Sequence, residues 1–195
     1  MKEKCIIGFL IFNFWTSNQI WATTPEQVVK KMVNAIKLKK FSKGLTEKDL
    51  EHNRQMVRIA SECFDIEAMG KATLDKHWEF IDAKKREELI DKIKDLIIKL
   101  AYPAQGDAID DIQVIYRGQQ IEEDHAKVNT LVIFKEKELR IDYLLHQKHN
   151  SWLTYDVLSN DRSLVEDYRK QFDKIITQYS IDKLFELLDK KLKAR

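Results

Sequence analysis

The fold is decided by residues 112–158, IQVIYRGQQIEEDHAKVNTLVIFKEKELRIDYLLHQKHNSWLTYDVL, in which apolar and polar residues largely alternate. A period of two is typical of β-strands with one buried face. We expect four strands here, joined by turns near residues 117–120, 135–137 and 150–151. Parallel neighbours would need long crossovers, so connections this short indicate antiparallel pairing. The stretch therefore predicts a four-stranded antiparallel meander sheet.

Helical patterns precede and follow this sheet in the sequence. In these segments apolar residues recur every three or four positions, and Ser, Thr, Asp or Pro stands near several of the expected starts. We expect helices over residues 25–39, from 46, from 65, over 83–102, over 165–179 and from 181. Helices, a sheet and then helices, with no linker between them, predict a single α+β domain.

The N-terminus has the pattern of an export signal. Lys2 and Lys4 precede an apolar run from Cys5 to Trp15, and the small residue Ala22 follows. The run is too short to cross a bilayer, which needs about 20 apolar residues. We expect residues 1–22 to be a signal peptide and residues 23–195 to be the mature domain, with an uncleaved anchor as the alternative. Cleavage would leave Cys63 as the single cysteine, which we expect to be a small buried hydrophobe.

Composition argues against several classes of function. The 34 Lys and Arg residues nearly balance 32 Asp and Glu, so the cationic excess typical of nucleic-acid binding is missing. The five glycines are too scattered for a phosphate-binding loop. The sequence contains neither HExxH nor GxSxG, and its five histidines show no metal-ligand spacing. We therefore predict no nucleic-acid partner, no metal, no cofactor and no catalytic residues.

Two alternatives remain open on the residues alone. Asp142 and His146 share one face of an expected strand, so they could supply an acid or base to an isomerase or dehydratase acting on a small apolar substrate. Side chains of this kind on a strand are more often plain surface. The lysine-rich ends at residues 37–43 and 190–195 could instead dock partners of a closed-core interaction protein.

An ordered set of motifs continues from the last expected strand into the helices after it. These motifs are Trp152, Tyr155 to Val157, Ser163 with Leu164, Tyr168 to Phe172, and the closing residues Ile181, Leu184 and Leu188. Upstream, Phe64 with Asp65, and His77 with Trp78, agree with the same pattern. In this combination the mature chain resembles the MlaC or toluene-tolerance family. The family has a Gly before the Ser-Leu pair, whereas this chain has residues 160–162, Asn-Asp-Arg, so we expect the local turn to differ.

The resemblance implies a cone-like arrangement in which a curved sheet is flanked by N-terminal and C-terminal helices. It also implies a periplasmic, monomeric, non-enzymatic carrier that holds phospholipid acyl chains in an apolar cavity. The partners implied are an inner-membrane ABC transporter complex and an outer-membrane lipoprotein complex. The candidate cavity wall, chosen by strand and helix facing, is Met69, Ile93, Ile97, Leu100, Val132, Phe134, Ile141, Tyr143, Leu145, Tyr155 and Val157. A closed core would bury the same residues and stays the alternative.

Overall fold

The computed structural model describes residues 23–37, 44–101, 112–134 and 136–193, with only the backbone described for 98–101. The predicted signal peptide and the expected end of the fourth helix at Tyr102 lie outside these residues. The helices are α1 (Pro25–Lys37), α2 (Glu47–Ser61), α3 (Ile66–Leu74), the 3-10 helix η1 (Asp75–Phe80), α4 (Ala83–Ala101), α5 (Leu164–Gln178) and α6 (Ile181–Lys193). The strands are β1 (Gln113–Glu122), β2 (His125–Phe134), β3 (Lys137–Lys148), β4 (Ser151–Ser159) and β5 (Arg162–Ser163).

The sheet is a meander in the order β1-β2-β3-β4-β5, and all neighbouring strands are antiparallel. The α+β class and the antiparallel meander are thus confirmed, but the number of strands was wrong. A fifth strand of two residues, β5, pairs Ser163 with Leu158 and leads directly into α5. A segment this short carries no periodicity, so the sequence pattern could not reveal it.

The turn expected at residues 117–120 is also wrong. Gly118 has a φ of +103° and lies at a register shift between Tyr116 and Gln119, so it forms an irregularity inside β1. The strand continues to Glu122, and the reversal follows at Glu123, whose φ is +53°. Gly118 therefore indicates a bulge within the strand and not a turn. Both positions favour a residue that can adopt positive φ.

Local capping explains where several helices begin. The Thr46 side chain accepts from the Asp49 N–H, and the Asp49 side chain accepts from the Thr46 N–H, which completes a capping box before α2. Asp65 caps α3 through the Ala68 N–H, and Ser180 accepts from the Lys183 N–H at the start of α6. Each of these three starts matches the expectation from sequence.

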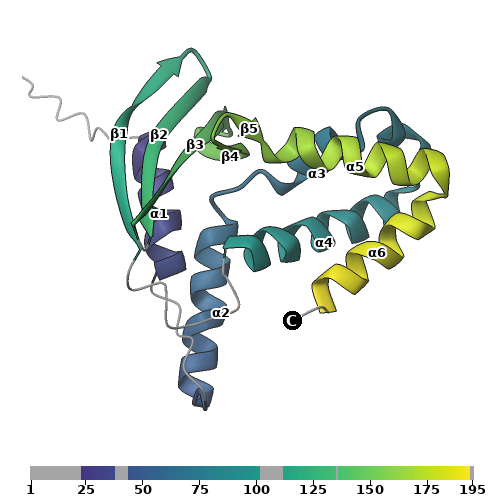
Figure 1. The fold of residues 1–195 in the computed structure, drawn as a ribbon, viewed down its shortest axis with the longest axis horizontal. Helices are drawn as coiled ribbons and strands as arrows, with labels where there is room; N and C mark the ends of the chain where they lie inside the picture. The colour runs from purple at the N-terminus through teal and green to yellow at the C-terminus, as the bar shows by residue number, and fades with distance from the viewer. Residues whose placement is uncertain (1–22, 38–43, 102–111, 135, 194–195) are drawn as a thin grey trace, which may run out of the picture.

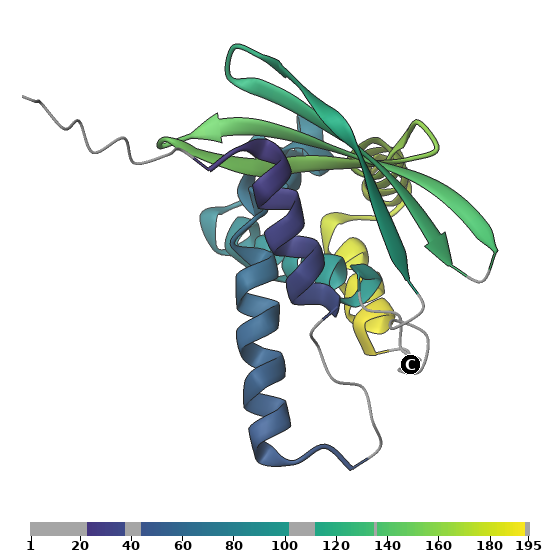
Figure 2. The same ribbon diagram turned by 90° about the vertical axis from the view of Figure 1, so that its left-hand side faces the viewer.

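Two hydrophobic clusters hold the domain together. The first joins α1, α2 and one face of the sheet, and it includes Val29, Met32, Val128 and Leu145. The second lies among α3, η1, α4, α5 and α6. Figure 1 shows α1 against the sheet and the α3–α6 helices at the other end of the molecule, and Figure 2 shows the same division after a quarter turn. Cys63 is buried in the first cluster, as expected, and burial raises the pKa of its thiol.

Candidate functional site

A partly open cavity of about 360 Å³ lies between α1, the sheet, α4 and the start of α5. Its lining is Met32, Val33, Ile36, Lys37, Phe64, Ile97, Ile112, Val114, Val132, Ile141, Tyr143, Val157 and Leu164. Twelve of these thirteen side chains are apolar or aromatic, and Lys37 at the end of α1 is the charged one. The volume falls within the range of about 300–1,000 Å³ that is common for small-molecule sites.

The sequence builds this wall from two periodicities. In α1, Met32, Val33 and Ile36 follow the three- and four-residue spacing that places side chains on one helix face. On the sheet, Val114 pairs with Val132 and Tyr143 pairs with Val157, so directly opposite residues on adjacent strands present apolar groups to the same side. The cavity lies where these two apolar surfaces meet the helices of the second cluster.

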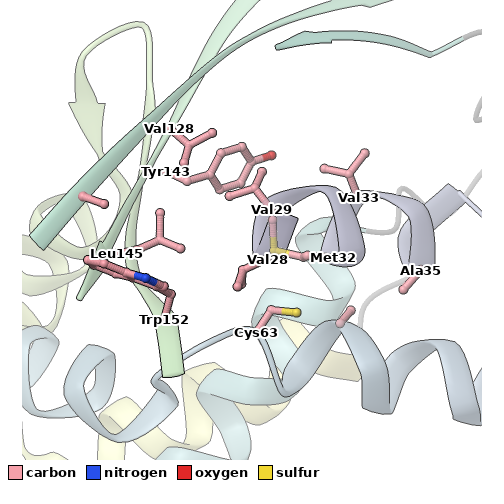
Figure 3. Packing of buried hydrophobic residues seen from close by; sticks show 12 residues of the cluster. Val28, Val29, Met32, Val33, Ala35, Cys63, Val128, Tyr143, Leu145 and Trp152 are labelled. Atoms are coloured by element: carbon pink, nitrogen blue, oxygen red, sulfur yellow. The ribbon is translucent and has the colours of Figure 1, made fainter. Parts of the chain in front are cut away.

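Polar groups near the wall are satisfied within the protein or are held neutral. The Thr130 hydroxyl, beside Val132 on β2, donates to the Ile141 carbonyl oxygen at 2.6 Å. Burial raises the pKa of Tyr143 above its ordinary value, and the nearby Tyr116 adds to the effect. Figure 3 shows the Tyr143 ring extending from the sheet over Val29 of α1. The wall therefore presents no ionised group except Lys37 among the residues that the structure describes.

A polar anchor sets the position of two wall residues. Asp156 is buried and accepts hydrogen bonds from the Ser163 hydroxyl at 2.5 Å and from the Val165 N–H at 3.1 Å. Ser163 in turn caps α5 by accepting from the Glu166 N–H at 2.9 Å. Val157 follows Asp156 and Leu164 follows Ser163 in the sequence, and both line the cavity. The anchor therefore ties β4 to the first turn of α5 at the cavity wall.

A second, more enclosed cavity of about 20 Å³ lies among α3, α4 and α5. Its lining is Met69, Thr73, Ile93, Leu96, Ile97, Leu164, Tyr168 and Phe172. Ile97 and Leu164 belong to both linings, so these two side chains separate the small cavity from the large one.

Comparison with known proteins agrees with this architecture. The family model described as "MlaC protein" matches residues 26–190. The chain belongs to the MlaC family. A phospholipid-binding protein from Ralstonia solanacearum, solved in complex with a phospholipid, shares the fold with a TM-score of 0.65 and 19% sequence identity. The match covers 88% of this chain and 96% of that one. No curated protein sequence matches the chain.

Eleven residues of this MlaC-family chain were proposed as cavity wall because of the strand or helix face they occupy. Seven of them line one of the two cavities. Ile97, Val132, Ile141, Tyr143 and Val157 line the large cavity. Met69 and Ile93 line the small one, which Ile97 also borders. Their contact with a ligand stays a prediction.

The other four proposed residues lie elsewhere. Leu145 is fully buried in the first cluster, where it packs beside Trp152 and Val128. Phe134 is half-buried at the end of β2 and is not part of either lining. Leu100 lies in α4, but its side chain is outside the described part of the chain.

Tyr155 was assigned to the wrong face of the sheet. The β3–β4 register passes from Leu144 opposite Asp156 to Leu145 opposite Thr154, which leaves Tyr155 as an extra residue in β4. A bulge shifts the alternation by one, so Val157 and Tyr155 no longer share a face. The Tyr155 ring instead lies 5.2 Å from the His146 ring and lines a polar cleft bordered by His125.

The family difference at residues 160–162 has a simple structural solution. Asn160 and Asp161 have φ values of +46° and +65°, so both occupy the left-handed region that Gly would favour. Asn and Asp are the residues other than Gly that adopt this region most readily. The turn between β4 and β5 therefore forms without the family's glycine.

Eight wall residues were missed by the selection from sequence. They are Met32, Val33, Ile36, Lys37, Phe64, Ile112, Val114 and Leu164. The apolar face of α1 and the alternation at the start of β1 were visible signals, but they predicted only burial. Phe64 gave no periodic signal, since it lies in the connection before α3, where it forms an isolated parallel bridge to Thr154.

The two residues considered as catalytic bases do not line the cavity. Asp142 is 1% exposed, and its Oδ2 lies 3.0 Å from the Lys127 amino group. His146 Nε2 lies 2.9 Å from Asp65 Oδ2, which also accepts from Lys148. Burial would raise the pKa of Asp65, but hydrogen bonds from Ala68, Lys148 and His146 outweigh it and lower the pKa. These groups form ion pairs that connect β2 with β3, and β3 with the start of α3.

Among the described residues, no group of three or more His, Cys, Asp or Glu side chains is arranged to hold a metal ion. None of the helices in the same part of the chain has both the length and the apolar character needed to cross a bilayer.

Proposed function

We propose that this MlaC-family protein carries a phospholipid or a related apolar lipid, with acyl-chain carbons in the large cavity. The observation that carries the proposal is the wall itself, which is apolar except for Lys37 and opens to the surface. Such a wall provides few hydrogen-bonding partners, and the polar groups of a substrate need such partners when they are buried. The phospholipid bound to the Ralstonia protein of the same fold supports the same ligand class.

The energetics favour a cavity over surface binding. A lipid with two acyl chains has about 30 methylenes, and at about 0.8 kcal/mol each their exposure to water costs on the order of 25 kcal/mol. Surface hydrogen bonds contribute only about 1 kcal/mol each, so they cannot offset this cost. A carrier must therefore enclose the chains.

The size of the cavity limits what it holds without rearrangement. If a methylene occupies about the volume of a water molecule, ~30 Å³, the 360 Å³ cavity has room for about a dozen. One acyl chain of about 15 methylenes already exceeds that space slightly. A lipid with two chains needs additional room or leaves part of a chain outside.

The proposed role extends to transport between membranes. We expect residues 1–22 to direct export, and the mature monomer to exchange lipid in the periplasm between an inner-membrane ABC transporter complex and an outer-membrane lipoprotein complex. This expectation rests on membership of the MlaC family. A passive carrier needs no nucleotide site of its own, since the transporter would supply the energy.

Native mass spectrometry of protein purified without detergent tests the binding step. We expect a mass increase equal to one lipid, which organic extraction removes and identifies. Ligand-free protein that also takes up no lipid from phospholipid vesicles would contradict the proposal. Transfer is tested separately, by measuring movement of a fluorescent phospholipid from donor to acceptor vesicles with and without the protein.

A further inference from the structure

The boundary between the two cavities consists of two aliphatic side chains from different helices. Ile97 extends from α4, and Leu164 is the first residue of α5. Both line the 360 Å³ cavity on one side and the 20 Å³ cavity on the other. Both are half-buried, which fits side chains that border open space instead of packed core.

The small cavity is unsuitable for water. Its lining includes the apolar side chains Met69, Ile93 and Phe172. The two hydroxyl groups in that lining already have partners, because Thr73 donates to the Gly70 carbonyl oxygen at 2.9 Å and Tyr168 accepts from Lys191. An apolar space without free polar groups stays dry, and its walls lose the dispersion contacts that an occupant would supply.

We propose that Ile97 and Leu164 limit the length of acyl chain that the protein accepts, and that the end of a longer chain enters the space that they occupy, which is continuous with the dry cavity, when they move aside. The inference rests on the proposed function and adds a specificity determinant to it. A chain that lies along α4 and α5 in the large cavity reaches Ile97 and Leu164 as part of the wall. Once it has filled the available space, further methylenes have to displace these two side chains.

These two side chains, which form the partition between the cavities, can move without breaking a hydrogen bond. Leu and Ile exchange between staggered rotamers, and their side chains contain no polar atoms. The backbone around Leu164 is fixed independently, since Ser163 caps α5 and is bonded to Asp156. Displacement therefore involves the side chains, while the helix start stays in place.

The test uses the delipidated full chain and a series of lysophosphatidylcholines with single acyl chains of about 10 to about 18 carbons. Each added methylene that becomes buried tightens binding about fourfold, and one that stays in water adds nothing. For the unmodified protein we expect Kd, measured by displacement of a fluorescent fatty acid, to improve with length and then reach a plateau. In Ile97→Ala, which removes three carbons, the plateau should move to chains about three carbons longer.

Leu164→Ala provides a second, independent opening of the same partition and should shift the plateau in the same direction. Ile175→Ala is the matched control, because Ile175 packs on the same hydrophobic cluster but lines neither cavity. Thermal unfolding of each variant, measured by circular dichroism, identifies the folded proteins to be compared.

The possible results distinguish failure of the partition from failure of lipid binding. A plateau that moves in both partition variants and stays in Ile175→Ala supports the partition. A plateau at the same chain length in a folded Ile97→Ala or Leu164→Ala overturns it, while lipid binding stands. Failure of the unmodified protein to bind any chain in the series, or phospholipid from vesicles, overturns the proposed function and the partition together.

Discussion

Replacing Val132 with tryptophan tests directly whether ligand occupies the large cavity. Val132 lies on β2 opposite Val114 and Leu139, and its side chain lines the wall. The change adds about seven heavy atoms to a space with room for about a dozen methylenes. The indole ring can occupy the cavity without breaking the ladder, because Trp is a good strand former and the backbone bonds are unchanged.

The expected loss of affinity follows from the methylenes displaced. If every added atom excludes one methylene, at about 0.8 kcal/mol each, binding weakens by at most ~5–6 kcal/mol. The cavity is partly open, so an acyl chain can shift toward the mouth and recover part of this loss. A cost of about half, near 3 kcal/mol, corresponds to about 100-fold weaker binding.

Displacement of a fluorescent fatty acid gives Kd, and native mass spectrometry gives the fraction of protein that carries lipid. Ile115→Trp is the matched control, because Ile115 is adjacent to Val114, is 38% exposed and does not line the cavity. We expect the control to bind lipid as the unmodified protein does. A folded Val132→Trp with unchanged Kd and unchanged lipid content would refute the assignment of this wall.

Three further predictions concern the framework around the cavity, and urea unfolding followed by circular dichroism measures each. Asp65→Asn keeps a capping oxygen but removes the charge that faces His146 and Lys148, so we expect a loss of about 1–3 kcal/mol at neutral pH. Because the folded-state pKa of Asp65 lies below its ordinary value of 3.8, this difference should shrink as the pH falls through that folded-state pKa; a difference independent of pH down to full protonation would contradict the charge argument. Ser163→Ala should cost about 1–2 kcal/mol through loss of the α5 cap, whereas an unchanged midpoint would show that the cap contributes little. Gly70→Ala should be neutral or stabilise by up to about 1 kcal/mol, since the added Cβ meets its nearest neighbour at an ordinary 3.5 Å; clear destabilisation would indicate that α3 and α4 pack more tightly here.

Features determined by neighbouring residues could be predicted from the sequence. The starts of α2, α3 and α6 depend on side chains at Thr46, Asp65 and Ser180 that bond within the next turn. The meander follows from alternation and short connections, which limit the possible pairings. These elements are specified by interactions that span only a few positions in the chain.

Features that depend on strand register could not be predicted in the same way. Tyr155 and Val157 alternate regularly in the sequence, but the extra residue in β4 places them on different faces. The connection before α3 pairs with β4 at this point, through bonds from the Asp65 N–H to the Thr154 carbonyl oxygen and from the Thr154 N–H to the Cys63 carbonyl oxygen. Such a contact between distant segments has no periodic signature in either of them.

The cavity could not be predicted from the sequence, because a cavity wall and a closed core both need buried apolar residues. Val128 and Val132 occupy the same face of β2, yet Val128 is fully buried in the first cluster and Val132 borders open space. Their chemistry is identical, so the difference comes from what lies opposite each one. Val128 belongs to the cluster in which α1 packs on the sheet, whereas Val132 faces the cavity that α1 shares with Ile97 of α4 and Leu164 of α5.

The polar motif residues help to locate that cavity, although they do not line it. Asp156 and Ser163 are bonded to each other, and each is followed by a wall residue, Val157 or Leu164. A buried carboxylate with several donors holds the backbone at one point, since moving it would leave hydrogen-bonding groups unpaired. The motif thus fixes the position of Val157 relative to Leu164. At this part of the wall, polar residues set the position of the backbone, and their apolar neighbours are the side chains that would contact the lipid.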